Sequence, residues 1–272
     1  MTRKYSLAHL TALKCSTPEL IRIAAQAGYD FISPRLVNMG VKGEMDYDLT
    51  KQPKLFQETV DAMRETGVGV HDIELFRIID NVDLKSYEPA MEAGKKLGAK
   101  HILSSVWTAN KEYYTEKFAQ LCDLAAQYDM TVNVEFVTWA DVRDLKTVLE
   151  LLNTVQRKNV GVMIDTLHAY RSRVAPEELR QIPREWFNFC HICDGPAEIP
   201  VSKEELIYVG RDAREYVGEG AIDIAAYVAQ MPKDTVCSIE LPNLANVAKN
   251  GYAEHVKYCI DSAKKYFAEK NL

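Results

Sequence analysis

Four side chains of the types that bind divalent metals lie between residues 135 and 240, each near the end of a short apolar run. They are Glu135 in TVNVEFV, Asp165 in VGVMID, His191 in FNFCHIC and Glu240 in TVCSIEL. A lone histidine in such a run is commonly a hydrogen-bonded core residue, whereas an unpaired buried carboxylate is costly and rare. Three neighbouring carboxylates would also repel one another, and a divalent cation is the simplest compensation. Three carboxylates and one imidazole with open positions suit Mn²⁺, Mg²⁺ or Co²⁺ better than structural zinc. The sequence therefore predicts one divalent metal ion bound by these four residues.

The alternation of side chains along a strand places these four residues on inward faces. In a β-strand, successive side chains point to opposite faces, so residues two apart share a face. The pairs that share a face are Asn133 with Glu135, Met163 with Asp165, Phe189 with His191, and Ser238 with Glu240. Consecutive parallel strands that each end in such a residue would gather the four side chains at one end of a barrel, where barrel enzymes assemble their sites.

The elements that must position these residues form a regular alternation of strand and helix. Short runs rich in β-branched and aromatic residues are separated by amphipathic helical segments, the first two of which are bounded by Ser16 and Gly28 and by Pro53 and Gly67. Such alternation implies parallel strands with right-handed crossovers. The predicted strands are 4–10, 29–36, 68–75, 101–107, 131–137, 160–165, 187–193 and 235–241, and the later helices are near 85–97, 110–128, 142–157, 221–231 and 251–268.

Eight such units favour an α/β fold of the (β/α)8 TIM-barrel type, as a single domain over residues 1–272. The rival is an open, doubly wound sheet, which would normally carry a glycine-rich phosphate turn after the first strand. The corresponding segment, HLTALKCS, contains no glycine. Residues 194–220 show little periodicity, so we expect them to form a long functional loop across the barrel mouth.

The charge and the apolar runs of the sequence limit the kinds of molecule that the protein is expected to bind. The net charge of −6 argues against nucleic acid, because phosphate neutralisation requires clustered Lys and Arg. The N-terminus lacks the apolar segment of a secretory signal, and no run is long enough to span a membrane, so we expect a cytoplasmic protein without a membrane partner. The expected partner is a small carbohydrate-like molecule, and assembly into a homo-oligomer is left open.

The spacing of Cys190 and Cys193 invites a zinc or redox interpretation. On a strand, however, two residues three apart point to opposite faces and cannot share a metal. We therefore expect the six cysteines to be free and mostly buried thiols.

An ordered set of short motifs carries a family resemblance over nearly the whole chain. The motifs are VEF at 134–136, IDTLH at 164–168, HICD at 191–194, REYVGEGAID at 214–223 and IELPN at 239–243. Together they resemble the xylose isomerase-like superfamily of barrels, which includes sugar-phosphate isomerases, ketose 3-epimerases, hydroxypyruvate isomerases and inosose dehydratases. The resemblance implies that Glu135, Asp165, His191 and Glu240 bind the metal.

The same resemblance implies that His168 and Arg214 contact the substrate. Val217 stands where the family usually has a proline, and Arg211 competes with Arg214 for this role. DNA-repair endonucleases of the superfamily use three metals and additional histidines, whereas this chain has six histidines and an acidic balance. That branch is therefore not expected.

The expected chemistry is removal of a proton next to a carbonyl, with Glu135 and Glu240 as the acid–base pair and the cation stabilising the enediolate. Proton return on the opposite face gives an epimerase, and transfer to the neighbouring carbon gives an isomerase. Loss of a β-hydroxyl instead gives a lyase of the inosose- or dehydroshikimate-dehydratase type. A non-catalytic sugar-binding barrel is a third possibility. Further residues expected to line the pocket are His9, Glu74 and Trp107.

Overall fold

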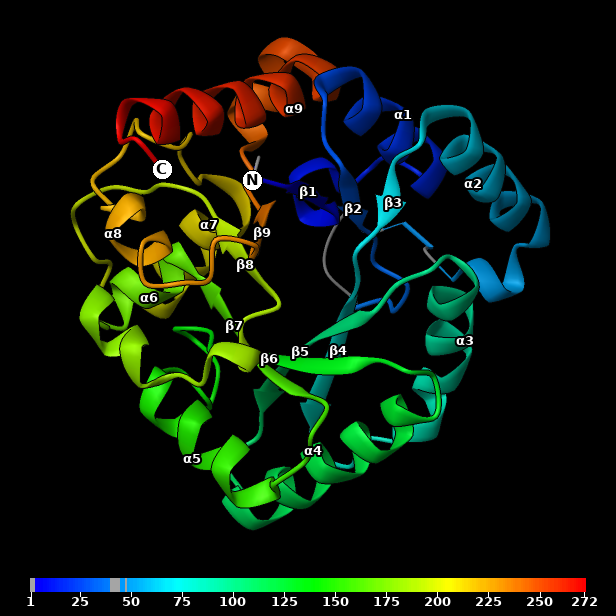
Figure 1. Ribbon diagram of the computed structural model, residues 1–272, viewed down its shortest axis with the longest axis vertical. Helices are drawn as coiled ribbons and strands as arrows, with labels where there is room; N and C mark the ends of the chain where they lie inside the picture. Colours follow the sequence, from blue (N-terminus) through cyan, green and yellow to red (C-terminus); the bar gives the residue numbers. More distant parts are fainter. Residues whose placement is uncertain (1–2, 40–44, 47) are drawn as a thin grey trace.

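A parallel β-barrel forms the centre of the protein, and helices surround it (Figure 1). The computed structural model describes residues 3–39, 45–46 and 48–272, so residues 1–2, 40–44 and 47 of the predicted domain lie outside the described residues. The sheet order is β3-β2-β1-β9-β8-β7-β6-β5-β4. The strands are β1 (Tyr5–Ala8), β2 (Phe31–Ser33), β3 (Gly69–Val70), β4 (Asp72–Ile79), β5 (His101–Trp107), β6 (Thr131–Glu135), β7 (Val160–Asp165), β8 (Phe189–Ile192) and β9 (Val236–Ile239).

The two ends of the sheet are joined in sequence, which closes the barrel. Only His71 separates β3 from β4. The stretch 69–79 therefore pairs with β2 on one side and with β5 on the other. An additional parallel bridge between Arg35 and Glu74 lies at this junction. The predicted TIM barrel is confirmed, with its third strand divided into two pieces.

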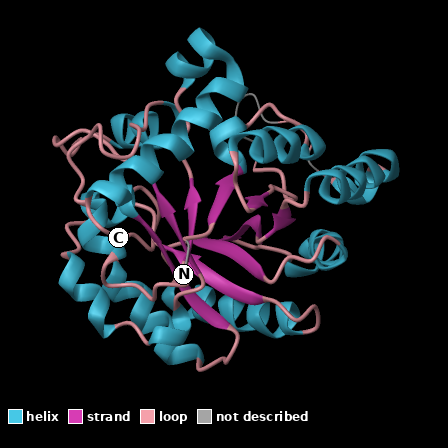
Figure 2. Cartoon of the chain, turned by 45° about the horizontal axis from the view of Figure 1, so that its top comes forward, coloured by secondary structure: helices cyan, strands magenta, loops and turns pink. Residues whose placement is uncertain are grey.

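The helices lie outside the strands (Figure 2). They are α1 (Thr17–Ala27), α2 (Pro53–Thr66), α3 (Glu88–Lys96), α4 (Lys111–Ala126), α5 (Leu145–Val155), α6 (Thr166–Arg171), α7 (Lys203–Asp212), α8 (Ile224–Val228) and α9 (Leu244–Glu269). A capping box of Ser16 and Glu19 begins α1, and Gly28 ends it at φ +88°. Among the described residues, no helix is long and apolar enough to cross a membrane.

Two apolar cores hold the barrel. The larger core packs the outward faces of the strands against the helices. The smaller core consists of Leu75, Leu103, Met163, Phe189 and Val236. Phe189 and Val236 are the first residues of β8 and β9 and share the inward faces of His191 and Glu240, so the smaller core lies inside the barrel beneath these polar side chains. The carboxyl ends of the strands are thereby left for polar side chains.

The structure corrects three details of the sequence interpretation. Residues 194–220 were expected to form a loop, but they contain α7, which Ser202 caps by accepting a hydrogen bond from the Glu205 amide. Only Gly210 in this helix is buried, so its apolar pattern is weak. The short helix α6 directly follows β7 and was not predicted. Helix α9 begins at Leu244 rather than near residue 251, with a break in its helical backbone at Gly251.

Candidate metal centre

The four predicted ligands converge at the carboxyl ends of the last four strands. Glu135 and Asp165 are the last residues of β6 and β7, His191 lies in β8, and Glu240 directly follows β9. One ligand atom from each residue can be chosen so that all four lie within 4.8 Å of one another. All four residues are buried, and each is at most 6% exposed. Strand alternation and barrel closure together therefore produce a compact group of three carboxylates and one imidazole.

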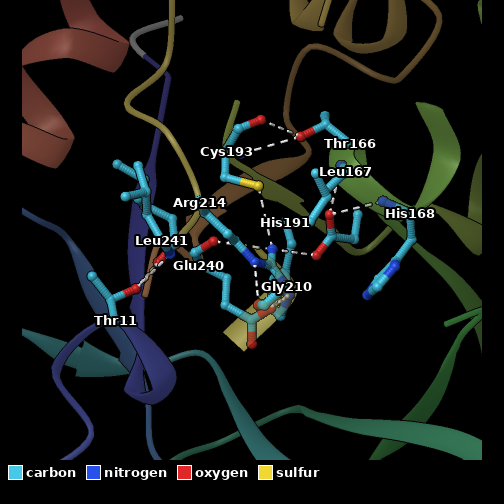
Figure 3. Close-up of polar contacts among 12 residues, drawn as sticks. Thr11, Thr166, Leu167, His168, His191, Cys193, Gly210, Arg214, Glu240 and Leu241 are labelled. Atoms are coloured by element: carbon cyan, nitrogen blue, oxygen red, sulfur yellow. Dashed lines mark hydrogen bonds and ion pairs between the residues drawn. The ribbon is translucent and has the colours of Figure 1, made fainter. Parts of the chain in front are cut away.

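Arg214 joins two of these carboxylates. Its Nη1 lies 2.6 Å from Asp165 Oδ2, and its Nη2 lies 2.7 Å from Glu240 Oε2. Nη1 also donates to the Glu240 carbonyl at 3.1 Å and contacts Cys193 Sγ at 3.3 Å (Figure 3). Nε donates to the Gly210 carbonyl of α7 at 2.8 Å. Arg214 is thus a fully buried partner of the ligand cluster, whereas Arg211 is only partly buried.

The carboxylates occupy different electrostatic environments. Burial raises the pKa of Glu135 well above its ordinary value, and the charges of Glu240 and Asp165 add to this shift. Burial acts in the same direction on Glu240, but Arg214 and His191 outweigh it and hold the Glu240 pKa well below its ordinary value. Burial likewise opposes ionisation of Asp165, yet Arg214 keeps the pKa of this carboxyl lowered. The two glutamates therefore differ in proton affinity.

The surroundings of His191 also suit the binding of a cation. Although burial disfavours its charged form, Glu240 and then Glu135 raise the pKa of His191 to about 10. Neither ring nitrogen has a hydrogen-bond partner, and Nδ1 lies 3.4 Å from Glu240 Oε2. Among the described residues, the side chain of Glu135 likewise has no hydrogen-bond or ion-pair partner, although its backbone pairs within the sheet. A buried imidazole that has no hydrogen-bond partner and lies beside three carboxylates fits a divalent cation.

His168 lies next to the cluster on α6. The amides of Leu167 and His168 donate to Asp165 Oδ1, so this candidate ligand also caps α6. The His168 ring lies edge-on to Trp139, with 4.9 Å between the ring centroids. Its Nδ1 is 3.1 Å from Thr138 Oγ1. Burial lowers the pKa of His168 to about 4, so the ring is neutral near pH 7.

The other predicted pocket residues lie on the first strands of the barrel. Glu74 is buried on β4, where Oε2 lies 3.4 Å from Arg35 Nε and Oε1 has no partner. His9 Nδ1 accepts from the Arg35 amide at 3.0 Å, and its Nε2 is 2.9 Å from the Cys15 carbonyl. His9 and Glu74 are thus linked through Arg35 rather than to each other. Trp107 ends β5 and donates to Ser105 Oγ at 2.8 Å. Contact of these residues with a substrate stays a prediction.

Sequence reasoning missed three residues that shape the site. Arg35 is the cation beside Glu74, Thr138 is the partner of His168, and Cys193 contacts Arg214. Arg35 lies at the end of the predicted second strand, 29–36, and this position could have marked it as a residue of the barrel mouth. The six cysteines are free and buried, as expected, and Cys190 lies 3.8 Å from Cys237 rather than near Cys193.

Comparison with known proteins places this geometry in a family. Residues 21–261 match the family model described as "Xylose isomerase-like TIM barrel". Inosose isomerase of Bacillus subtilis (strain 168) is 25% identical over 204 residues, which cover 69% of this chain and 71% of that protein. Inosose isomerase of Bacillus velezensis is 22% identical over 241 residues, covering 81% of each chain.

Solved structures share the fold. The IOLI protein, crystallised with a binding zinc atom, superposes with a TM-score of 0.80 at 20% identity and covers 98% of both chains. D-allulose 3-epimerase from Methylomonas sp., in complex with D-allulose, has a TM-score of 0.70 at 15% identity and covers 97% of both chains. Since the family model matches most of the sequence, this chain belongs to the xylose isomerase-like TIM-barrel family.

Proposed function

We propose that this protein is a divalent-metal-dependent isomerase or epimerase that acts on a sugar or related polyhydroxy ketone. The observation that carries the proposal is the convergence of Glu135, Asp165, His191 and Glu240 on one buried point. The curated relatives support the substrate class, because they bear the name inosose isomerase. Glu135, Asp165, His191 and Glu240 would hold the metal.

The bound cation would act as a Lewis acid that stabilises negative charge on the carbonyl and adjacent hydroxyl oxygens of the substrate. The chain's own residues supply the proton transfers. Glu135 and Glu240 are the two proton carriers, one for removal and the other for return. Both carboxylates are ionised when they bind a metal, so either can act as the base.

Arg214 is a positioning residue in this proposal. By bridging Asp165 and Glu240, the guanidinium fixes the orientation of two carboxylates at once. His168 is placed to contact the substrate, because Asp165 organises the start of its helix and Thr138 orients its ring. The near-complete burial of the cluster would exclude water from the reacting carbon.

An assay in deuterated water tests the proposal. The protein would be freed of metal with a chelator, dialysed, and reloaded separately with Mn²⁺, Co²⁺, Mg²⁺ or Zn²⁺. Inosose and D-allulose are the first substrates to try, since they occur in the names of related proteins. We expect deuterium in the recovered or isomerised compound only after metal is restored. An unsaturated product would establish the lyase alternative, and full activity of protein shown to be metal-free would overturn the metal requirement.

A further inference from the structure

Helix α7 is linked to the candidate metal centre through its buried residue, Gly210. Arg214 follows this helix, and its Nε donates to the Gly210 carbonyl at 2.8 Å. The guanidinium of Arg214 then reaches Asp165 and Glu240 at 2.6 and 2.7 Å (Figure 3). The backbone of Arg214 is held separately, because its amide donates to the Pro242 carbonyl at 3.1 Å. The position of α7 therefore acts on the guanidinium of Arg214 more than on its backbone.

A second contact of Gly210 fixes how close α7 lies to the barrel. A methyl group added at Gly210 would lie 2.3 Å from Cη2 and 2.7 Å from Cζ3 of Trp139. Both distances are far shorter than the separation at which non-bonded carbon atoms attract one another. Alanine is a better helix former than glycine, so helix propensity does not explain a glycine here. The close packing on Trp139 does.

Trp139 is itself packed against the site. It lies in the loop that follows β6, the strand that ends in Glu135. Its ring lies edge-on to the ring of His168, with 4.9 Å between the centroids. The indole Nε1 is buried and has no hydrogen-bond partner, so packing rather than hydrogen bonding holds the ring in place. One ring thus contacts both His168 and the part of α7 that carries the Gly210 carbonyl.

We propose that Gly210 and Trp139 are positioning residues of the candidate metal centre and act through Arg214. The contact between them sets the position of α7, and the Gly210 carbonyl then directs the guanidinium toward Asp165 and Glu240. Because the guanidinium is positively charged, its place between these carboxylates opposes a metal cation bound to them. The contact therefore also sets how tightly the centre binds its metal. This role rests on the proposed metal centre and on no particular reaction.

Gly210→Ala tests the contact, because it adds one methyl group without weakening the helix. The measurements are urea unfolding and calorimetric titration with Mn²⁺, both on metal-free, full-length protein. We expect lower stability and a Mn²⁺ affinity about threefold to tenfold tighter than that of the wild type, since the displaced guanidinium opposes the cation less. Lower stability with unchanged Mn²⁺ affinity would indicate a purely structural glycine and would overturn the proposal.

Trp139→Phe provides the rescue. The smaller ring can remain beside His168 but lacks the distal atoms that the added methyl group would meet. The double variant Gly210→Ala/Trp139→Phe should therefore recover most of the wild-type stability and Mn²⁺ affinity. No recovery would show that Trp139 is not the residue through which the glycine acts. Tyr208→Ala, at a position of α7 that is 60% exposed, is the control and should leave both measurements at wild-type values.

A second pair of variants shows whether the effect passes through Arg214. In the Arg214→Gln background, Gly210→Ala should change Mn²⁺ affinity by less than about twofold, because no guanidinium is left to displace. A change as large as in the wild-type background would overturn the role of Arg214. The rescue by Trp139→Phe does not depend on the folding of Arg214→Gln.

Urea unfolding separates this proposal from the proposed function, because it needs no metal. A wild type that fails to bind Mn²⁺ would refute the proposed metal centre. The losses of stability in Gly210→Ala and Arg214→Gln would still decide whether the glycine positions the arginine: a combined loss smaller than their sum supports the link, and full additivity refutes it.

Discussion

Two buried glutamates, on barrel strands β4 and β6 with only β5 between them, illustrate two ways of keeping a carboxylate inside a protein. Glu74 on β4 has a cation of its own, because Arg35 lies 3.4 Å away. Glu135 on β6 instead faces Glu240 and Asp165, whose charges raise its pKa further. Burial, opposed by Arg35, still raises the pKa of Glu74 to about 8, and the charge of Glu240 adds to this shift. Glu74 nevertheless has a cation beside it, whereas Glu135 has none and faces two further carboxylates of the candidate metal centre.

The strongest test of this comparison is removal of the acid–base groups. Glu135→Gln and Glu240→Gln keep the shape and one coordinating oxygen but remove the proton carrier. Each should lower kcat by about a hundredfold or more while metal affinity falls only modestly. Steady-state kinetics and metal titration would measure the two effects separately. Near-wild-type turnover in both variants with metal bound would refute proton transfer by these residues.

Arg214→Gln should produce the largest loss of stability. It leaves Asp165 and Glu240 buried without their shared cation, and breaking a buried pair in this way costs about 3–5 kcal/mol. Denaturant unfolding of metal-free protein would measure this loss. Added Mn²⁺ should raise the Tm of the variant more than that of the wild type, since the cluster gains negative charge. Arg211→Gln serves as the control, and an equal loss there would contradict the assignment of Arg214.

His168→Ala should separate substrate handling from metal binding. We expect metal affinity close to wild type and a fall in kcat/KM of about tenfold to a hundredfold, because the ring is positioned beside the ligands without belonging to them. Thr138→Val removes the oxygen that contacts Nδ1 and should produce a smaller fall. Complete loss of metal from His168→Ala would show that the histidine is a ligand.

Metal binding should release protons. With its pKa raised to about 10 by Glu240, against the effect of burial, His191 is protonated at neutral pH in the metal-free protein. Coordination requires the neutral ring, so at least one proton must leave and affinity should increase as pH rises toward 10. Calorimetry in buffers of different ionisation enthalpy measures the number released. An affinity that does not change between pH 6 and pH 9 would contradict this linkage.

Glu74→Gln should have the smallest effect of the glutamate substitutions. The neutral side chain keeps its shape beside Arg35, and no ligand of the cluster is lost. We expect unchanged metal affinity and a fall in kcat of less than about tenfold, below the usual range for acid–base groups. A loss as large as that of Glu135→Gln would mean that Glu74 on β4 also takes part in the chemistry.

The spacing of residues along the sequence was sufficient to predict the barrel and the four residues that gather at the candidate metal centre. Side chains on a strand alternate with period two, so Glu135, Asp165 and Glu240 could be assigned to inward faces before any contact was known. Repeated strand–helix alternation then implied that the carboxyl ends of the strands meet at one end. Helix α7 could not be recognised in the same way, because only Gly210 in it is buried and its apolar pattern is correspondingly weak.

By itself, the sequence determined which residue types point into the barrel, because that depends only on spacing along each strand. The tertiary structure alone decided how their charges are compensated. Arg214 reaches Asp165 across 49 positions of sequence, and Arg35 reaches Glu74 across 39. No local pattern shows that Arg214 rather than Arg211 is the buried partner. These pairings depend on distances between side chains from different strands and loops, and barrel closure is what sets those distances.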